Sequence, residues 1–483
     1  MREEDDVYFE DPEFLEYLQK YEDACKNCES IYMDADELTD IAEYYMMQNR
    51  EEDANQAIAL ARSLHPDSVE PMIFLARQQM FHDNLEAAQD IAHSIPDQND
   101  SETIFLWMEI LIKLEVPADA MRLVTEKIGE QSEKDAFLYD AASIFIDYGC
   151  YDEAAQLVNT LEKEYPDYYR TRKLKIEVLM GKREYEKAIP LLQDYLEEEP
   201  YSISAWRTLA EAFVEEANYM DALDSCEYCL AIDPEYQQAM ILKAYCLLHL
   251  NMMEASHAMY QKVLKDDPQN SNLLQMDANA LAFMGRFEEA KDTLKKALKY
   301  LPKYDENRIQ MLINMAYVEG KCHNTTNAMK ALEEAVKLSE KQGGGTEFHL
   351  IRGAILLENG KEAEAAKQFE LAYQKSPDKQ KSLLAIGIAY AETQNYKKAV
   401  TFLESIKDKF NCEESEVAIP YLAYCYKNIH DQENFLKYMR HAAKADREIT
   451  EFLFQKDYPN IQPEEYYMYA FKNAYGRFPT EEE

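Results

Sequence analysis

Glycine is scarce in this sequence, with 12 residues among 483, well below the roughly 7 per cent of an average protein. Turn-rich all-β folds and loops that cradle phosphate groups both depend on glycine, so the scarcity argues against either. The chain also lacks a P-loop and any Gly-x-Gly-x-x-Gly or Gly-x-Ser-x-Gly sequence. Because no other catalytic constellation is present, we expect a protein that is not an enzyme.

Basic residues are also few. Lysine and arginine together number 51, against 92 aspartates and glutamates, and the net charge is −41. A surface this negative repels the phosphates of nucleic acids and of anionic lipids. We therefore expect neither nucleic acid nor a membrane among the partners.

Long hydrophobic runs are missing too. No run approaches the ~18 to 20 apolar residues that cross a bilayer, and the first ten residues, MREEDDVYFE, are acidic where a secretory signal is apolar. The nine cysteines are an odd number spread over a long chain, which favours reduced thiols over a disulfide framework. These features predict a cytoplasmic location.

The feature that is present is a repeat. Prolines stand 34 residues apart at Pro166, Pro200, Pro234, Pro268 and Pro302. Between them, apolar residues recur at helical spacing on both sides of a mid-repeat turn. A fixed period of this length predicts an array of helix-turn-helix units, each ended by a proline that cannot continue the second helix.

Two columns of small residues follow the same period. Twelve units begin near Ala35, Val69, Ser101, Asp135, Tyr169, Ile203, Gln237, Ser271, Ile309, Thr346, Gln380 and Glu416. The start of the second helix is small in eleven of them, at Ala54, Ala88, Ala120, Ala154, Ala188, Ala222, Ser256, Ala290, Ala328, Ala365 and Ala399. The facing place on the first helix is small in ten. Helices approach closely only where side chains are small, so the columns predict tightly packed pairs; the alternative is an ordinary bundle whose alanines align by accident.

One unit serves as the reference. Between Ile203 and Tyr236, places 4, 7, 8, 11, 20 and 32 hold Trp206, Leu209, Ala210, Phe213, Ala222 and Pro234. This pattern resembles the tetratricopeptide repeat (TPR) family, and the resemblance extends over roughly residues 35 to 445. It implies an all-α fold, a right-handed superhelical α-solenoid of TPR helix-turn-helix repeats.

The array divides the chain into four parts. Residues 1–34 form an N-terminal capping region, 35–308 hold units one to eight, 309–445 hold units nine to twelve after a phase break, and 446–483 form C-terminal aromatic capping helices. The segment 341–346 contains three consecutive glycines and is a candidate hinge. A loop that does not move is the alternative.

In the family that the sequence resembles, the first helices line a concave groove and a few fixed places on them meet a bound peptide. Carried over to this sequence, those places give the candidate peptide-binding residues Arg170, Lys173, Arg207, Tyr245, Asn272, Gln275, Asn279, Asn314 and Tyr317. Gln275, Asn279 and Asn314 also look like part of the carboxylate clamp of chaperone-binding members, but the basic residues of that clamp are missing.

The segment from Tyr169 to Lys175 holds four cations in seven residues. In so acidic a protein, Arg170, Lys173 and Arg207 indicate an anchor for an acidic peptide or for the C-terminal carboxylate of a partner, because arginine grips a carboxylate with two hydrogen bonds. The alternative is that these cations neutralise nearby glutamates on a solvated face.

The cysteine and histidine patterns do not predict a metal site. Cys25 with Cys28 and Cys226 with Cys229 have the Cys-x-x-Cys spacing, but zinc needs four ligands together and about six repeats separate the pairs. Cys226 and Cys229 take core places of a second helix, so we expect buried thiols; the role of Cys25 and Cys28 stays open. The nine histidines form no helical ligand pair. No metal or other cofactor is expected.

Together these observations predict a non-enzymatic scaffold that binds an extended peptide or partner protein in the concave groove. The alternative is a structural oligomer that self-associates through its C-terminal aromatic segment, which holds Tyr466, Tyr467, Tyr469 and Phe471.

Overall fold

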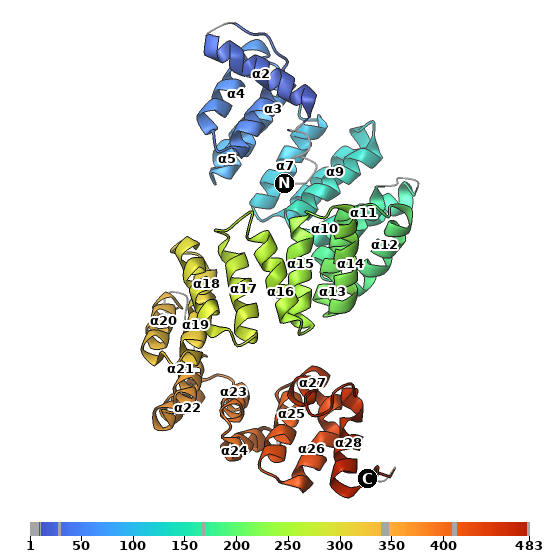
Figure 1. Cartoon of the computed structure of the whole chain (residues 1–483). Helices are drawn as coiled ribbons and strands as arrows, with labels where there is room; N and C mark the ends of the chain where they lie inside the picture. The colour runs from blue at the N-terminus through green and yellow to red at the C-terminus, as the bar shows by residue number, and fades with distance from the viewer. Residues whose placement is uncertain are drawn as a thin grey trace. The chain divides into compact units, whose positions relative to one another are not determined.

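The computed structural model describes residue 9 and residues 11–27, 30–166, 170–339, 347–407 and 413–480. All regular structure in this part of the chain is helical (Figure 1). None of these helices has both the length and the hydrophobicity required to span a bilayer. Twelve consecutive helix pairs make up most of the fold, which confirms the all-α solenoid of helix-turn-helix repeats. The candidate hinge at 341–346 lies outside the described residues.

The first six pairs are α3 (Ala35–Met47) with α4 (Glu51–Leu64), α5 (Glu70–Phe81) with α6 (Leu85–Ser94), α7 (Ser101–Lys113) with α8 (Pro117–Lys127), α9 (Lys134–Asp147) with α10 (Tyr151–Glu164), α11 (Thr171–Gly181) with α12 (Tyr185–Glu198), and α13 (Ile203–Glu215) with α14 (Tyr219–Ile232). The other six are α15 (Gln237–His249) with α16 (Met253–Val263), α17 (Ser271–Phe283) with α18 (Phe287–Tyr300), α19 (Asn307–Lys321) with α20 (Thr325–Ser339), α21 (Glu347–Glu358) with α22 (Glu362–Lys375), α23 (Lys379–Glu392) with α24 (Tyr396–Lys407), and α25 (Glu413–Asn428) with α26 (Gln432–Ala445).

A turn of one geometry joins the two helices of each pair. One residue in each of the twelve turns has a positive φ, such as 57° at Asn49. In that turn the amide of Arg50 donates to the carbonyl of Tyr45 at 2.8 Å, the bond that defines a Schellman helix end. Glycine, which adopts this backbone without strain, holds only three of these positions, Gly149, Gly285 and Gly360.

The two columns of small residues meet inside each pair. The alanines that begin the second helices, from Ala54 to Ala399, are all 0% exposed. Ser256 takes this place in α16, and its Oγ donates to the backbone carbonyl of Ala244 in α15 at 2.7 Å. In the facing column, a Cβ on Gly353 would lie 2.4 Å from the ring of Phe369. Small side chains therefore permit the close packing, as the sequence predicts.

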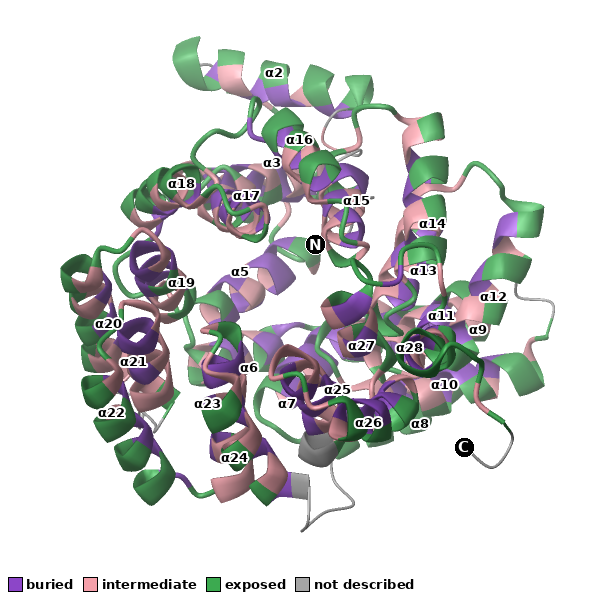
Figure 2. Cartoon of the chain, turned by 60° about the horizontal axis from the view of Figure 1, so that its bottom comes forward, coloured by how far each residue is buried: buried purple, intermediate pink, exposed green. Residues whose placement is uncertain are grey.

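First and second helices form two layers. Within Met1–Asn218 and within Tyr219–Glu483, first helices pack on their own second helices, as α19 does on α20. First helices there also contact one another, as α19 does α21 and α21 does α23. Figure 2 shows this arrangement for α19 to α22, where α20 and α22 carry much of the exposed colouring and α19 and α21 are coloured mostly as buried or intermediate. Hydrophobic clusters that join successive repeats, such as those around Phe137 and around Leu273, form the core between the layers.

The chain forms two compact units, each of several repeats. The first unit is Met1–Asn218 and the second unit is Tyr219–Glu483. Each unit contains whole hydrophobic clusters, such as one around Phe105 and Phe137 in the first unit and one around Leu273 and Met311 in the second. The subdivision that the sequence suggests after residue 308 stays a prediction.

Short helices cover the end repeats. At the front, α2 (Pro12–Asn27) buries Phe14 and Tyr21 in the same cluster as residues of α3. At the back, α27 (Arg447–Phe454) and α28 (Tyr466–Tyr475) pack on α25 and α26. Phe454 and Tyr466 are 0% and 1% exposed, so this aromatic segment extends the core. Single 3-10 turns stand at η1 (Ile128–Glu130) and η3 (Pro463–Glu465).

Candidate interaction surface

The surface that corresponds to the predicted groove is the inner face, which we define as places 2, 5, 6, 9, 12 and 13 of the first helices. Polar side chains there join neighbouring repeats. In the first unit, Arg77 of α5 donates two hydrogen bonds to Glu109 of α7, at 2.8 and 3.2 Å. In the second unit, Asn314 of α19 donates to Asn279 of α17 at 3.1 Å. These contacts place inner-face residues of successive repeats side by side.

The predicted cationic anchor lies on α11 and α13 in the first unit. Arg170, directly before α11, is exposed, and its guanidinium carbon is 5.6 Å from the centroid of the Tyr139 ring. Lys173 is exposed in the first turn of α11. Arg207 of α13 forms an ion pair with Glu211 of the same helix at 2.7 Å. Among the described contacts, none joins one of these three cations to another.

The other cations of this segment have structural partners. Arg172 pairs with Glu198 of α12 at 2.9 Å, and Lys175 pairs with Glu162 of α10 at 2.7 Å. Tyr169, which begins the segment, lies outside the described residues. Arg172, Lys175 and Arg207 thus neutralise glutamates, as the alternative interpretation expects, and ligand binding by Arg170 and Lys173 stays a prediction.

The predicted amide residues form a row in the second unit. Besides the bond from Asn314 to Asn279, Gln310 of α19 donates to the side-chain oxygen of Asn314 at 3.0 Å. Gln275 and Asn279 are half-buried on α17, and Asn272 is exposed in its first turn. Within the described residues, the amide nitrogen of Asn279 makes no hydrogen bond of its own. The row thus keeps donors available to a ligand.

Aromatic side chains adjoin this row. Tyr245 of α15 lies 4.4 Å from His249, which in turn stacks on Tyr219 of α14 with ring planes 13° apart and centroids 4.4 Å apart. Burial lowers the pKa of His249, which favours the neutral imidazole. The sequence predicts Tyr245 but not its two neighbours, although the spacing of four residues between Tyr245 and His249 on one helix is a detectable signal.

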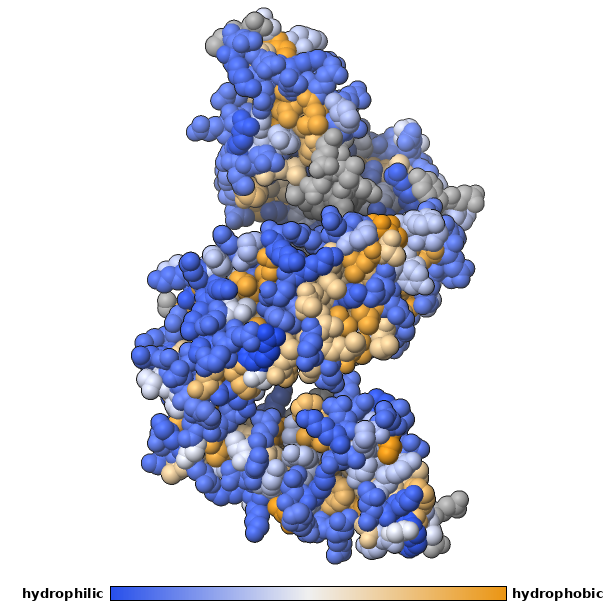
Figure 3. Space-filling model, viewed as in Figure 1, coloured by the Kyte–Doolittle hydropathy of each residue, from blue (hydrophilic) through white to orange (hydrophobic). Residues whose placement is uncertain are grey.

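The inner face of α15, α17 and α19 carries no charge from its second to its twelfth place. These places hold Gln238, Ile241, Leu242, Tyr245 and Leu248, then Asn272, Gln275, Met276, Asn279 and Ala282, then Gln310, Ile313, Asn314, Tyr317 and Gly320. We call this group the neutral section. Figure 3 shows a mostly hydrophilic face on which hydrophobic side chains gather in the middle, over α14 and α15.

Charged residues of the same helices are engaged elsewhere. Lys243 of α15 pairs with Glu227 at 2.5 Å, and Arg308 of α19 pairs with Glu334 at 3.2 Å. Asp277 of α17 is 0% exposed. The charged residues of these helices therefore do not add charge to the neutral section in the folded protein.

A hollow of about 440 Å³ adjoins the neutral section where α19, α21 and α23 end. Lys321 and Glu358 form an ion pair in its wall, and Glu392 lines it as well. The protein around Glu392 displaces solvent and raises the pKa of its carboxyl group. Tyr317, 44% exposed, stands beside the hollow with the Lys321 amine 5.1 Å from its ring centroid. The sequence did not predict the hollow, because its three charged residues come from three repeats.

The thiols are placed as their core positions indicate. Cys226 and Cys229 are 0% exposed, and a hydrogen bond with Cys246, together with burial, raises the pKa of Cys226. Cys25 is exposed, and Cys28 lies outside the described residues. In the part of the chain that the structure describes, no three His, Cys, Asp or Glu side chains are grouped to hold a metal ion.

Comparison with known proteins places these repeats in a family. One model described as tetratricopeptide repeat matches residues 213–275, 254–315 and 356–417, and a second with the same description matches 139–203 and 315–380. Together they cover more than half of the chain.

Curated relatives match a smaller part. Subunit 2-B of the ER membrane protein complex from Xenopus laevis is 30% identical over 119 residues, which are 24% of this chain and 40% of that protein. Subunit 2-A from the same organism is 29% identical over 128 residues, 26% of this chain and 43% of that one. The chain thus spans less than half the length of these relatives.

Solved structures are similar at low identity. A tetratricopeptide repeat protein from Parabacteroides merdae has a TM-score of 0.43 and 16% identity, covering 53% of this chain and 98% of its own. Yeast Tom70 has a TM-score of 0.40 and 15% identity, covering 87% of this chain and 94% of its own. The repeat period, the helix pairs and the matching family models support a protein-interaction scaffold, and they show that this chain belongs to the tetratricopeptide repeat family.

Proposed function

We propose that this protein is a cytoplasmic scaffold without catalytic activity, which binds an extended segment of a partner protein along the inner face. The observation that carries the proposal is the neutral section. There, amide side chains from α17 and α19 are hydrogen-bonded into a row, beside the aromatic stack of α14 and α15.

The spacing of the repeats suits an extended ligand. Packed helices lie about 8 to 10 Å apart, and an extended chain rises about 3.3 Å per residue. Each repeat therefore meets about every third residue of the ligand. Asparagine and glutamine offer both a donor and an acceptor, so Asn279, Asn314 and Gln275 suit backbone amides of any sequence.

The partner segment that fits the neutral section is uncharged. A charged group would lose part of its hydration there without meeting an opposite charge, which is costly. Tyr245, Ile241 and Leu248 instead offer contact to apolar side chains, and tyrosine gives much contact area at a small entropic cost.

The test compares partner capture by two variants of the full-length protein. We expect Asn279→Ala combined with Asn314→Ala to lose the partner that the wild-type protein captures from its native cytosol, while helicity stays unchanged. The matched control is Asn327→Ala, which removes an exposed amide from the second helix α20 and is expected to capture normally. Equal capture by the double variant and the wild type contradicts the proposal.

A finer part of the proposal concerns the cations on α11 and α13. Arg170 and Lys173 face solvent in a protein of net charge −41, which supports an anchor for an acidic side chain or a C-terminal carboxylate. Reversing Arg170, Lys173 and Arg207 to glutamate is expected to abolish capture of a partner held by this anchor. Reversing Lys295, Lys296 and Lys299, exposed on the second helix α18, is the charge-matched control, and loss of capture by both variants argues against a specific anchor.

Self-association is a second candidate, favoured by aromatic residues that the C-terminal helices leave uncovered. Phe452, Tyr475 and Phe478 are 61%, 59% and 47% exposed. If this surface joins two copies, changing the three residues to serine converts the oligomer seen by light scattering into a monomer. Tyr201→Ser with Tyr304→Ser, at exposed tyrosines elsewhere, is the control. A wild-type protein that is already monomeric at high concentration rules out this function.

A further inference from the structure

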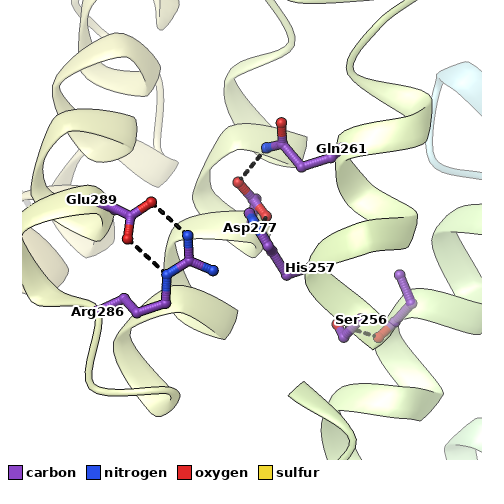
Figure 4. A network of polar contacts seen from close by, with 7 residues as sticks. Ser256, His257, Gln261, Asp277, Arg286 and Glu289 are labelled. Atoms are coloured by element: carbon purple, nitrogen blue, oxygen red, sulfur yellow. Dashed lines mark hydrogen bonds and ion pairs between the residues drawn. The ribbon is translucent and has the colours of Figure 1, made fainter. Parts of the chain in front are cut away.

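A buried polar network lies behind the neutral section, between α16 and α17 (Figure 4). Nδ1 of His257 is 2.5 Å from Oδ1 of Asp277, and Gln261 donates from Nε2 to Oδ2 of Asp277 at 2.8 Å. The Asp277 side chain is 0% exposed and that of His257 is 21% exposed. The carboxyl group therefore depends on these two side chains in place of water.

Asp277 stands at a place that is apolar in most repeats. The seventh place of the first helix packs against the preceding second helix, and it holds Ile41, Leu75, Leu209, Met315, Ile386 and Leu422 in other repeats. Lys175, Lys243 and Arg352 also occupy this place, but Glu162 and Glu227, the partners of the two lysines, are 40% and 55% exposed. Solvent screens those two pairs, whereas Asp277 is enclosed.

The charged groups around the network largely balance one another. Arg286, which precedes α18, makes two hydrogen bonds to Glu289, at 2.7 and 2.5 Å. The charge of Arg286 also helps to lower the pKa of Asp277. The charge of His257 in turn helps to lower the pKa of Glu289. The charge of Glu254 on α16 helps to raise the pKa of Arg286. Among the described residues, His257 is thus the one cation-forming group in direct contact with Asp277.

The remaining titratable neighbours lie on α15 and α16. Burial raises the pKa of Tyr260, on the same helix as His257, above its usual range. From α15, the charges of Tyr245 and Cys246 add to this rise in the pKa of Tyr260. The burial of Asp277 makes any net charge on its carboxyl group costly.

The charge of the network depends on a single proton. When Nε2 is also protonated, one proton between Nδ1 and Oδ1 makes the pair neutral overall, whichever of these two atoms carries it. Loss of one proton from the pair leaves a net negative charge at the buried carboxyl group, even where His257 still donates Nδ1–H to Asp277. Burial raises the pKa of Asp277, although the hydrogen bond and charge of His257 lower it. In the unfolded chain, the pKa of aspartate is near 3.9. Because the native pKa of Asp277 is higher, protonation of Asp277 stabilises the folded state fully below the unfolded pKa, and this stability is lost as the pH rises through the native pKa.

We propose that the Asp277–His257 network is a pH-responsive joint, in which loss of one proton from the pair leaves an uncompensated buried charge and loosens the packing of α16 on α17. The joint separates two parts of the neutral section, because α16 is paired with α15, which carries Tyr245, while Asn279 lies on α17. Loosening changes their spacing and weakens partner binding as the pH rises. This consequence for binding rests on the function proposed above, whereas the joint itself does not.

Hydrogen exchange of the full-length protein, read by mass spectrometry, tests the joint without any partner. After correction for intrinsic exchange, we expect peptides from α16 and α17 to lose protection as the pH is raised through the native pKa of Asp277. The opening equilibrium changes about tenfold for each unit by which folding displaces the pKa of Asp277. The seam between α22 and α23 has Ile386 at the equivalent place and is expected to keep its protection.

Asp277→Asn is the matched variant, because an amide accepts from Gln261 and donates to neutral His257 without titrating. We expect it to retain protection of α16 and α17 and to abolish the pH dependence. Should this variant fail to fold, His257→Gln keeps a donor to Asp277, and loosening is expected at lower pH because no imidazole shares the proton. The joint is refuted if the pH dependence persists in Asp277→Asn, is unmoved by His257→Gln, or is equal at the control seam.

Partner capture over the same pH range is measured separately. Capture that stays constant while the joint titrates refutes the coupling to the neutral section and leaves the joint in place. Capture that the double alanine variant of Asn279 and Asn314 does not affect refutes the proposed function and leaves the exchange result valid.

Discussion

Within a helix pair, one methyl group decides whether two side chains fit. Alanine is the common residue in the first-helix column, yet α21 has Gly353 there. The reason is Phe369 of α22, a 3% exposed ring whose Cε1 would be 2.4 Å from a Cβ on Gly353. Because protein interiors are close-packed, the missing methyl and the large ring form one packing solution.

We expect Gly353→Ala to destabilise the protein by about 1 kcal/mol. Overpacking costs about 1 to 3 kcal/mol, which exceeds the gain of about 1 kcal/mol in helix propensity because the enclosed ring has little room to move. Phe369→Leu in the same protein is expected to recover part of the loss. Urea unfolding of both single variants and the double variant measures the coupling; additive effects would show that the two residues do not share a space.

The column at the start of the second helices makes a similar prediction. Ala290 of α18 is 0% exposed, so Ala290→Leu should cost about 1 to 3 kcal/mol. Ala255→Leu on α16 is the control, because Ala255 is exposed and such changes usually fall within about 0.5 kcal/mol. Thermal melting distinguishes the two, and equal melting temperatures would contradict the repeat phase.

At the scale of the element, the turn inside each pair imposes one left-handed residue whatever its side chain. This residue caps the first helix through a Schellman bond, and in nine of the twelve turns it is not glycine. At Ala217, with φ of 54°, the residue has no polar group that could offset the strain. The packing of the two helices therefore selects a backbone that the local sequence disfavours.

Ala217→Gly is expected to raise the free energy of unfolding by about 0.5 kcal/mol. Relief of a left-handed residue gives about 1 to 2 kcal/mol, and the greater freedom of glycine in the unfolded state removes about 0.4 to 1 kcal/mol. Ala258→Gly, at an exposed position inside α16, has the opposite sign, with a loss of about 1 kcal/mol. Urea unfolding of both variants checks the signs, and destabilisation by Ala217→Gly would refute the strain.

At the scale of the whole molecule, repulsion among like charges opposes compact structure. The net charge of −41 already counts every lysine and arginine, so it remains however many surface ion pairs form. Exposed ion pairs also contribute little stability. Salt screens the repulsion and the pairs alike, so its net effect shows which of them is larger.

We expect added sodium chloride to raise the melting temperature near neutral pH by roughly 2 to 4 °C, equivalent to about 1 kcal/mol in a unit of about 200 residues. The effect should vanish near the isoelectric point of about 4.6, where the net charge is small. Calorimetry at both pH values measures it. A melting temperature that falls with salt near neutral pH would show that ion pairs outweigh repulsion.

Much of the fold was predictable because the repeat imposes the same steric condition twelve times. Helices that begin at Ala35, Ser101, Ile203, Gln237 and Ser271 do so where the repeat phase predicts. The turns were less visible, since a left-handed residue such as His323 or Gln394 carries no glycine signal.

The candidate site was predictable only in part. The family places located Asn279 and Asn314, which the structure joins by a hydrogen bond. They did not locate the stack of Tyr219 on His249 or the enclosure of Asp277 by His257. These contacts cross from one repeat to the next, and the sequence pattern within a repeat does not specify them. Binding by Arg170, Lys173, Arg207, Tyr245, Asn272, Gln275 and Tyr317 stays a prediction.

The sequence by itself determined the number of repeats, their phase and the close packing within each pair, because small residues and prolines act locally and recur at a fixed spacing. Only the tertiary structure decided which polar groups are buried and which remain available on the inner face. The physical reason is that burial of a side chain such as Asp277 depends on how one repeat packs against the next.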